Sequence, residues 1–296
     1  MGIAEGELPF VSVIVVTLNR RKQLKNCLNS IFKLDYPPDR FEVIVVDGNS
    51  QDCTKEMIIR EFPKVRFFVQ KRKGLPSARN TGWEHAEGPF VAYTDDDCVV
   101  NRSWLKDLIN GFTSHGIGAV GGPVLYLHPE QITNRFYQTP IGAFQLGKIE
   151  RLLKQHENLI TANMAIRFEA FKKVRFLESL VYADSEDYEF CWSLMEAGYQ
   201  IKYVPNAVVL HDIDPNRASI ARLLRRAFYS GISHYIAERR RNSRFTLTSK
   251  FLRAFLGGVV DFFRGERYES RLANFFWLDL CFVSFLSSIF LFYEDF

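Results

Sequence analysis

The chain has 296 residues, enough for one large α/β domain with an extension or for two small domains. Its 47% hydrophobic and 24% charged residues describe a globular protein that can bury a full core. The net charge is +4, but residues 217–272 hold thirteen Lys and Arg against four Asp and Glu, so the remaining chain is slightly acidic. A basic segment of this kind favours an anionic partner, either a membrane surface or a nucleic acid.

The cysteines and the N-terminus favour a reducing, cytoplasmic setting. No C-x-x-C pair occurs among the five scattered cysteines, which argues against zinc sites and disulfide frameworks. Residues 1–9 are a polar, acidic tail without the basic and apolar segments of a secretory signal.

Strands and helices alternate through the first hundred residues. Apolar, β-branched runs predict strands, and the segments between them have helical spacing. The predicted strands are Phe10–Thr17, Phe41–Val46, Val65–Val69 and Phe90–Tyr93, and the helices are Leu24–Phe32, Cys53–Glu61 and Pro76–Ala86. This βαβ spacing predicts an α/β fold with a parallel, doubly wound sheet.

The second half of the chain is less regular. A helix is expected over Ala183–Ala197, with Gly198 placed to end it. Residues 129–155 carry little periodicity and are expected to form a mobile stretch over the site. Further strands are expected at Gly118–Leu127, Leu159–Ile166, Ile201–Val204 and Ala207–Leu210.

Polar clusters follow three of the predicted strands, at Thr17–Asn19, Asp47–Asn49 and Asp95–Asp97. In doubly wound sheets, ligands bind beyond the carboxyl ends of the strands, so these clusters should converge on one crevice. Three adjacent carboxylates at a strand end repel one another unless a cation lies there, and hard oxygen ligands suit Mg²⁺ or Mn²⁺. The alternative is an acidic turn that caps the helix starting near Ser103.

The first strand is followed by Thr-Leu-Asn-Arg, without glycine. That excludes a Rossmann fingerprint and a P-loop, which both need glycines for close approach of phosphate. A bound diphosphate would need a metal and basic side chains instead. The segment Lys71–Asn80 supplies such charges before a helix N-terminus, although a solvated basic loop is the alternative.

Two further positions have both a catalytic and a structural interpretation. Glu186 and Asp187 begin a predicted helix, where acidic residues commonly complement the helix dipole, but a carboxylate there could also act as a general base. His211 follows a strand whose end should face the crevice, and it is either structural or a ligand of metal or diphosphate.

Taken together, six segments resemble glycosyltransferase family 2: VSVIVVTLNR, EVIVVDGNSQDCT, KGLPSARNTG, AYTDDDCVV, NLITANMAI and SEDYEFCWSLMEAGYQIKYVPNAVVLH. The resemblance covers about residues 10–212 in family order. It implies a GT-A fold, a DXD-type acidic motif, a nucleotide-sugar donor, Mn²⁺ or Mg²⁺ as cofactor, and inversion at the anomeric carbon.

The resemblance also implies roles for individual residues. Asp187 would be the catalytic base with Glu186 beside it, and Asp97 would ligate the metal, with Asp95 and His211 also in the metal set. The implied donor-binding set is Thr17, Asn19, Arg20, Asp47, Asn49, Arg72, Arg79, Asn80, Asp95, Asp96 and Asn163. Processive members carry a Q-x-x-R-W element, whereas residues 221–228 here contain the arginines without Gln or Trp. We therefore expect one sugar to be transferred per encounter.

The last part of the chain, 213–296, is predicted to be a basic and apolar helical extension of the 10–212 catalytic domain. Residues 275–292 contain one charge, Asp279, and reach the lower limit of about 17–25 residues for a membrane span. Membrane association at the cytoplasmic face is favoured because the basic segment precedes this stretch, with a buried helix or an oligomer interface as alternatives.

The sequence therefore predicts an inverting, metal-dependent glycosyltransferase that moves one sugar from a nucleotide-sugar to an acceptor hydroxyl. A UDP-sugar is favoured over GDP- or dTDP-sugars, the acceptor is a glycan or a lipid-linked one, and nucleic acid is not expected as a partner. The alternatives are a non-catalytic sugar-nucleotide-binding or membrane-scaffolding protein and a sugar-phosphate nucleotidyltransferase. The last of these would need a glycine-rich phosphate loop, which is absent after the first strand.

Overall fold

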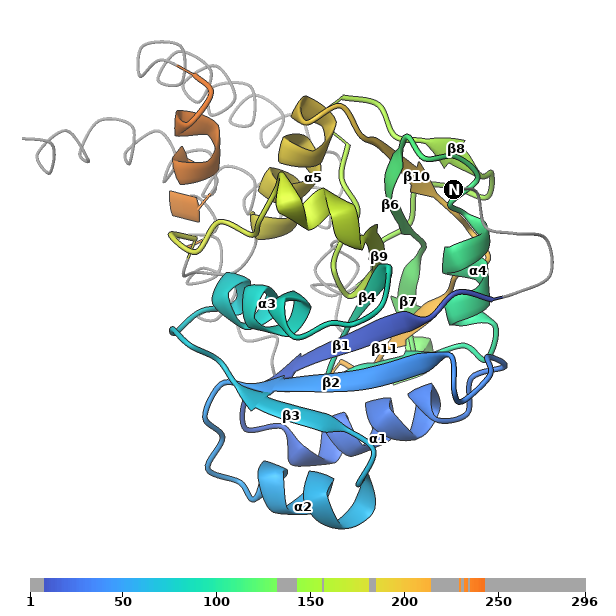
Figure 1. The fold of residues 1–296 in the computed structure, drawn as a ribbon, viewed down its shortest axis with the longest axis vertical. Coiled ribbons are helices and arrows are strands. Elements are labelled where there is room, and N and C mark those ends of the chain that lie inside the picture. Colours follow the sequence, from blue (N-terminus) through green and yellow to red (C-terminus); the bar gives the residue numbers. More distant parts are fainter. Residues whose placement is uncertain are drawn as a thin grey trace, which may run out of the picture. The chain divides into compact units, whose positions relative to one another are not determined.

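The computed structural model describes residues 8–131, 143–155, 157–180, 185–213, 229, 232–233 and 235–242 (Figure 1). The chain divides into two compact units. The first comprises Met1–Pro129, Gly142–Glu178 and Asp187–Ile213, and the second comprises Glu130–Ile141, Ser179–Glu186 and Asp214–Phe296. The fold and the candidate site described below belong to the first unit.

A mixed eight-stranded sheet in the order β3-β2-β1-β4-β9-β6-β10-β8 forms the centre of the first unit. Its parallel part consists of β1 (Val11–Thr17), β2 (Phe41–Asp47), β3 (Arg66–Val69) and β4 (Phe90–Asp95). Next to β4 the direction changes, because β9 (Asn163–Arg167) runs antiparallel to both β4 and β6 (Ile117–Gly121). The edge is built by β10 (Gln200–Tyr203), parallel to β6, and by β8 (Arg151–Leu152), antiparallel to β10.

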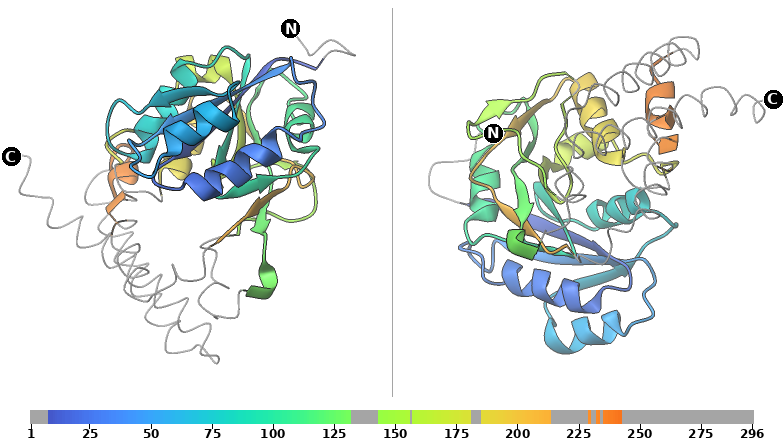
Figure 2. Two further views of the ribbon diagram at one scale, coloured as in Figure 1. Left: turned by 90° about the horizontal axis from the view of Figure 1, so that it is seen from below. Right: turned by 180° about the vertical axis from the view of Figure 1, so that it is seen from behind.

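Helices cover both faces of this sheet, and this explains why β1 is apolar except at Ser12 and Thr17. Val11, Val13 and Val15 pack with buried side chains of α1 (Arg21–Ile31), α2 (Thr54–Glu61) and α4 (Trp104–Asn110). Ile14 and Val16 point to the other face and pack with α3 (Leu75–Glu84) and α5 (Glu186–Glu196). Figure 2 shows α1 and α2 together on one side of the sheet. A strand buried on both faces reads as a continuous apolar run.

A second, three-stranded sheet lies at the end of β4. It has the order β5-β11-β7, where β5 is Cys98–Val100, β11 is Val209–His211 and β7 is Val124–Tyr126. The acidic triplet is thus the connection between β4 and β5, which explains why an apolar run resumes directly after it. His211 pairs with Cys98 across β5 and β11, so residues 113 positions apart in sequence are brought together at the triplet.

The α/β class and the parallel strands of the first half are confirmed, whereas the sheet as a whole is mixed rather than wholly parallel. The strand expected over Gly118–Leu127 is divided into β6 and β7 around Gly122. A Cβ at Gly122 would lie 2.0 Å from the Ala207 carbonyl oxygen, so the close approach of two backbones requires glycine there. Gly198 ends α5 with a φ of 88°, as its sequence position indicates.

Several predictions fall largely or wholly outside the described residues. They include the N-terminal tail, part of the 129–155 stretch and the apolar segment 275–292. Of the predicted extension 213–296, residues 213, 229, 232–233 and 235–242 are described, and residues 235–239 are helical. Within the described part of the chain, no helix combines the length and the apolar character that crossing a membrane requires.

Candidate functional site

The acidic triplet is held by a buried network of charges that begins on β1. Asp96 accepts a hydrogen bond of 2.7 Å from the Thr17 hydroxyl, at the end of β1. Nη1 of Arg20 bridges two carboxylates, at 2.8 Å from Asp96 Oδ1 and 2.6 Å from Asp97 Oδ2. The sequence analysis assigned Arg20 to the donor, and the structure shows it as the positive partner of the triplet.

His211 completes this end of the site from β11. Its Nε2 lies 3.2 Å from Asp97 Oδ1, and the Asp212 amide donates a 2.8 Å hydrogen bond to the Asp97 carbonyl. Both contacts follow from the pairing of β5 with β11. Asp97 and His211, both in the predicted metal set, are therefore neighbours in the structure, and their role as metal ligands stays a prediction.

Burial raises the pKa of two of the three carboxyl groups. Asp96 has its pKa raised to about 6, chiefly by desolvation, with Asp97 adding to the rise and Arg20 opposing it. The pKa of Asp95 is also raised, mainly by burial, and Arg79 opposes that shift. Asp96 is 3% exposed, and a carboxylate so far removed from water favours additional positive charge beside it.

Asp97 and His211 could hold a divalent cation if a bound ligand supplied further metal-binding atoms. Two ligands of one octahedral ion at about 2.1 Å from the metal lie about 3 Å apart. The 3.2 Å between Asp97 Oδ1 and His211 Nε2 matches that spacing. Among the described residues no group of three or more His, Cys, Asp or Glu side chains forms a complete metal site. Diphosphate oxygens and water would have to supply the remaining ligands, as is common for Mg²⁺ sites on nucleotides.

The loops after β1 and β2 form a second, more exposed part of the site. Ser50 binds both carboxylate oxygens of Asp47, one through its amide at 2.8 Å and the other through its hydroxyl. The backbone N–H of Asn19 donates to Ser50 Oγ at 2.7 Å, and the side-chain Oδ1 of Asn19 accepts from the backbone N–H of Gln51 at 2.7 Å. Asn19 and Asn49 both have positive φ, 52° and 73°, a conformation that asparagine tolerates better than most residues.

Asp187 lies in the first turn of α5 and forms the third part of the site. Its Oδ1 accepts a 2.8 Å hydrogen bond from the Thr161 hydroxyl and lies 3.5 Å from Arg79 Nη1. Arg79, in α3, also places Nη2 3.9 Å from Asp95 Oδ1, so its guanidinium lies between the triplet and Asp187. Glu186, the preceding residue, belongs to the second compact unit.

Two predicted donor-binding asparagines are instead fully engaged inside the fold. Asn163 is 0% exposed, donates to the carbonyls of Pro123 and Ala207 at 2.9 and 2.6 Å, and accepts from the Trp104 indole at 2.8 Å. Asn80 donates to the Phe176 carbonyl at 2.9 Å and accepts from the Phe176 amide at 3.1 Å. These bonds give both amides a structural role. Among the predicted basic residues, Arg72 is exposed and pairs with Glu178 at 3.3 Å.

The sequence analysis did not identify Thr161, Ser50 or Glu178 as site residues. Thr161 lies within the quoted segment NLITANMAI, but a single threonine before a strand carries no chemical signal. Ser50 follows Asp47 by three residues, and a serine at that offset commonly bonds an aspartate in a turn.

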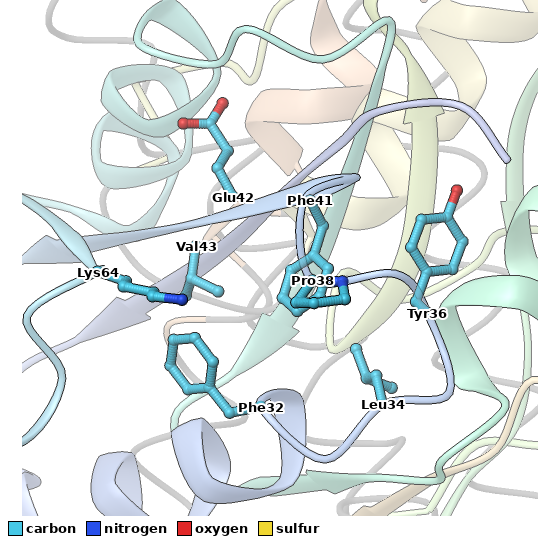
Figure 3. A pocket seen from close by; sticks show the side chains of 8 residues that line it. All are labelled: Phe32, Leu34, Tyr36, Pro38, Phe41, Glu42, Val43 and Lys64. Carbon is cyan, nitrogen blue, oxygen red and sulfur yellow. The ribbon is translucent and has the colours of Figure 1, made fainter.

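The hollow in Figure 3 is not part of this site. It has a volume of about 230 Å³ and is lined by Phe32, Leu34, Tyr36, Pro38, Phe41, Glu42, Val43 and Lys64. Phe41 and Val43 stand at the start of β2, whereas Asp47 stands at its end. The hollow therefore lies toward the amino ends of the parallel strands, away from the acidic triplet.

Comparison with known proteins identifies relatives in sequence. The model of the family described as Glycosyl transferase family 2 matches residues 12–175. Glycosyltransferase AglE of Haloferax volcanii is 28% identical over 232 residues, which are 76% of this chain and 72% of that protein. A Methanococcus voltae protein named dolichyl N-acetyl-α-D-glucosaminyl phosphate 3-β-D-2,3-diacetamido-2,3-dideoxy-β-D-glucuronosyltransferase is 23% identical over 218 residues, 67% of this chain and 65% of that one.

The fold is also found among solved structures. The mannosyltransferase PcManGT from Pyrobaculum calidifontis, in complex with GDP-Man and Mn²⁺, superimposes with a TM-score of 0.66 at 19% sequence identity. The match covers 96% of this chain and 88% of that one. At this identity the similarity establishes a common GT-A-like fold.

Proposed function

We propose that this chain, which belongs to Glycosyl transferase family 2 and is a glycosyltransferase, uses a divalent cation to transfer one sugar per encounter with inversion. The donor is a nucleotide-sugar and the acceptor group is a hydroxyl. The observation that supports the metal and donor assignment is that Asp97 Oδ1, in the acidic triplet, lies 3.2 Å from His211 Nε2, next to the buried carboxylate of Asp96.

At the metal end, Asp97 Oδ1 and His211 Nε2 would hold the ion. When bound, the cation supplies Lewis-acid neutralisation of the departing diphosphate. Arg20 keeps Asp96 and the second oxygen of Asp97 compensated, so that Asp97 offers the ion one fixed oxygen. Mn²⁺ fits this mixed set better than Mg²⁺, because one of the two protein ligands is an imidazole nitrogen.

At the loop end, Asp47 and the Asn19 and Asn49 turns would hold the nucleotide. Asp47 is fixed by Ser50 and accepts only, so it suits the ring N–H of a base such as uracil. Thymine and guanine also carry a ring N–H, so this contact is compatible with dTDP- and GDP-sugars as well, and a UDP-sugar is the donor that we favour.

Asp187 would be the general base. It takes the proton of the acceptor hydroxyl as the acceptor oxygen bonds to the anomeric carbon, and the bond from that carbon to the diphosphate oxygen breaks on the opposite face. The nucleoside diphosphate leaves with the electron pair, and the anomeric configuration inverts. Base catalysis of this kind contributes about 10²–10⁴ to the rate.

The acceptor is proposed to be a glycan or a lipid-linked hydroxyl compound presented at the cytoplasmic face of a membrane. Two features support this proposal. The M. voltae relative carries a dolichyl-linked sugar phosphate in its name, and residues 217–272 of this chain carry nine more basic than acidic residues. A basic segment attracts anionic lipid surfaces.

A donor screen tests the proposed function. The full-length protein is incubated with UDP-, GDP- and dTDP-sugars, with Mn²⁺ or with a chelator, and its melting temperature is measured. One nucleotide class should raise the melting temperature in Mn²⁺, and the shift should largely disappear with the chelator. A donor identified in this way should then be consumed when acceptor is added. A shift that is equal with the chelator would contradict the metal assignment, and binding without turnover on any glycan or lipid-linked acceptor would favour a non-catalytic protein.

A further inference from the structure

Thr161 is a buried residue that the mechanism above does not use. It precedes β9 by two residues and is 1% exposed. β9 runs antiparallel to β4, and the last pair at this end of the two strands joins Asn163 to Thr94. The residues that precede Asn163 therefore continue past the end of β4 at which Asp95 stands. Thr161 therefore lies near the end of β4 that carries Asp95.

The hydroxyl of Thr161 donates to Asp187 Oδ1 at 2.8 Å, a normal length for such a bond. Arg79 Nη1 also donates to this oxygen, but at 3.5 Å, which is long for a hydrogen bond. The Arg79 guanidinium is itself fixed, because its side chain is 3% exposed and lies over the Phe176 ring at 5.6 Å. Of the two, the Thr161 contact determines the orientation of the carboxylate more directly.

We propose that Thr161 is a positioning residue for the general base, and that its hydroxyl holds the Asp187 carboxylate in the orientation that accepts the proton of the acceptor. The inference rests on the proposed role of Asp187. Asp187 stands in the first turn of a helix and is 20% exposed at its side chain, and the hydrogen bond from Thr161 fixes the position of its Oδ1.

The expected effect is on the chemical step and not on donor binding. A carboxylate displaced by about 1 Å can lose about 10²-fold in rate, whereas the nucleotide contacts at Asp47 are unaffected. Removal of the hydroxyl should therefore lower kcat with little change in the KM for the donor. A purely structural threonine would affect the melting temperature and leave kcat of the folded enzyme unchanged.

The test uses Thr161→Val, which keeps the shape and removes the donor, and Thr161→Ser, which keeps the donor. We expect kcat of Thr161→Val to fall about 10- to 100-fold with the donor KM within about twofold, and Thr161→Ser to stay within about threefold of the unmodified enzyme. Thr94→Val is the matched control, since the Thr94 hydroxyl is buried without a partner among the described residues. That control should leave kcat within about twofold.

A double-mutant cycle with Asp187→Asn separates this inference from the proposed function. In the Asp187→Asn background, Thr161→Val should change the residual rate less than about twofold, because the group that it positions is gone. If Thr161→Val does not fold, Thr161→Ala supplies the same comparison.

Two results would overturn the inference: a folded Thr161→Val or Thr161→Ala enzyme with normal kcat, or a loss confined to the donor KM. If Asp187→Asn itself transfers sugar normally, the base assignment fails whatever Thr161 does.

Discussion

The two ends of the crevice are stabilised in different ways. At the acidic end, Asp96 and Asp97 are buried and compensated by Arg20, and Asn163 behind them ties β9 to the segment that leads into β11. At the loop end, Asp47 is also buried, but the turn residues around it are more open: Ser50, which binds its carboxylate, is half-buried, and Asn19 and Asn49 are exposed.

The difference predicts different consequences of mutation. A buried charge or amide that loses its partner cannot turn to water, so loss of a partner at the acidic end costs stability as well as function. At the loop end, Asn19 is exposed and Ser50 half-buried, so water can partly replace a bond that either of them loses. Substitution of these two partners of the loop end should therefore affect nucleotide binding more than folding.

Asn163→Ala should have the largest effect. It leaves the Trp104 indole and the carbonyls of Pro123 and Ala207 without their partner, which we expect to cost about 4 kcal/mol in the free energy of unfolding. Urea unfolding measures the loss, and Asn158→Ala, at a partly buried amide with one local bond, should cost less than about 1 kcal/mol. A stable Asn163→Ala protein with a raised donor KM would instead support the predicted contact of Asn163 with the donor.

Arg20→Gln should have the second-largest effect. It leaves two buried carboxylates without their cation, and because the Arg20 side chain is 27% exposed we expect the lower end of the usual range, about 3 kcal/mol. Mn²⁺ should restore part of the lost melting temperature. The control is Arg102→Gln, whose exposed pair with Asp35 should contribute less than about 1 kcal/mol. Equal losses at the two arginines would contradict the claim that the buried pairing with Arg20 stabilises the acidic end more than an exposed ion pair does.

Asp97→Asn should weaken Mn²⁺ binding more than about 100-fold, because it removes the charge of the carboxylate whose Oδ1 lies 3.2 Å from His211 Nε2. Asp95→Asn should weaken it much less, since Asp95 contacts Arg79 instead. Calorimetric titration of Mn²⁺ into the protein with nucleoside diphosphate measures both. If Asp95→Asn weakens Mn²⁺ binding as much as Asp97→Asn or more, the assignment of Asp97 as the main carboxylate ligand is wrong.

Ser50→Ala should have the smallest effect. Loss of one hydroxyl that orients Asp47 should weaken nucleotide binding about fivefold, equivalent to about 1 kcal/mol, with no marked change in melting temperature. Ser114→Ala, on an exposed turn, should change neither quantity. A large loss of stability in Ser50→Ala would show that the loop end also supports the fold.

Much of the fold and the broad position of the site could be predicted from the sequence. The apolar runs that end at Thr17, Asp47 and Asp95 mark parallel strands, and the carboxyl ends of parallel strands meet at one edge. The mixed part of the sheet could not be predicted, because β9 has the same apolar composition whether it runs parallel or antiparallel to β4.

The direction and partners of individual side chains were also not predictable. From its position in a predicted strand, Asn163 could equally well contact a sugar. Only the structure shows that its side-chain amide accepts a hydrogen bond from the Trp104 indole. The pairing of Arg20 with Asp96 and Asp97 spans more than seventy residues and depends on how β1 and β4 align. No local pattern reports such a contact.

The most direct test of the account is Asp187→Asn, assayed for donor binding and for transfer in the same preparation. The account predicts that the dissociation constant of the nucleotide-sugar in Mn²⁺ stays within about threefold, while the rate of sugar transfer falls by at least about 10²-fold. Transfer at the normal rate would contradict the assignment of the base, and with it the arrangement of the three parts of the site around a single reaction.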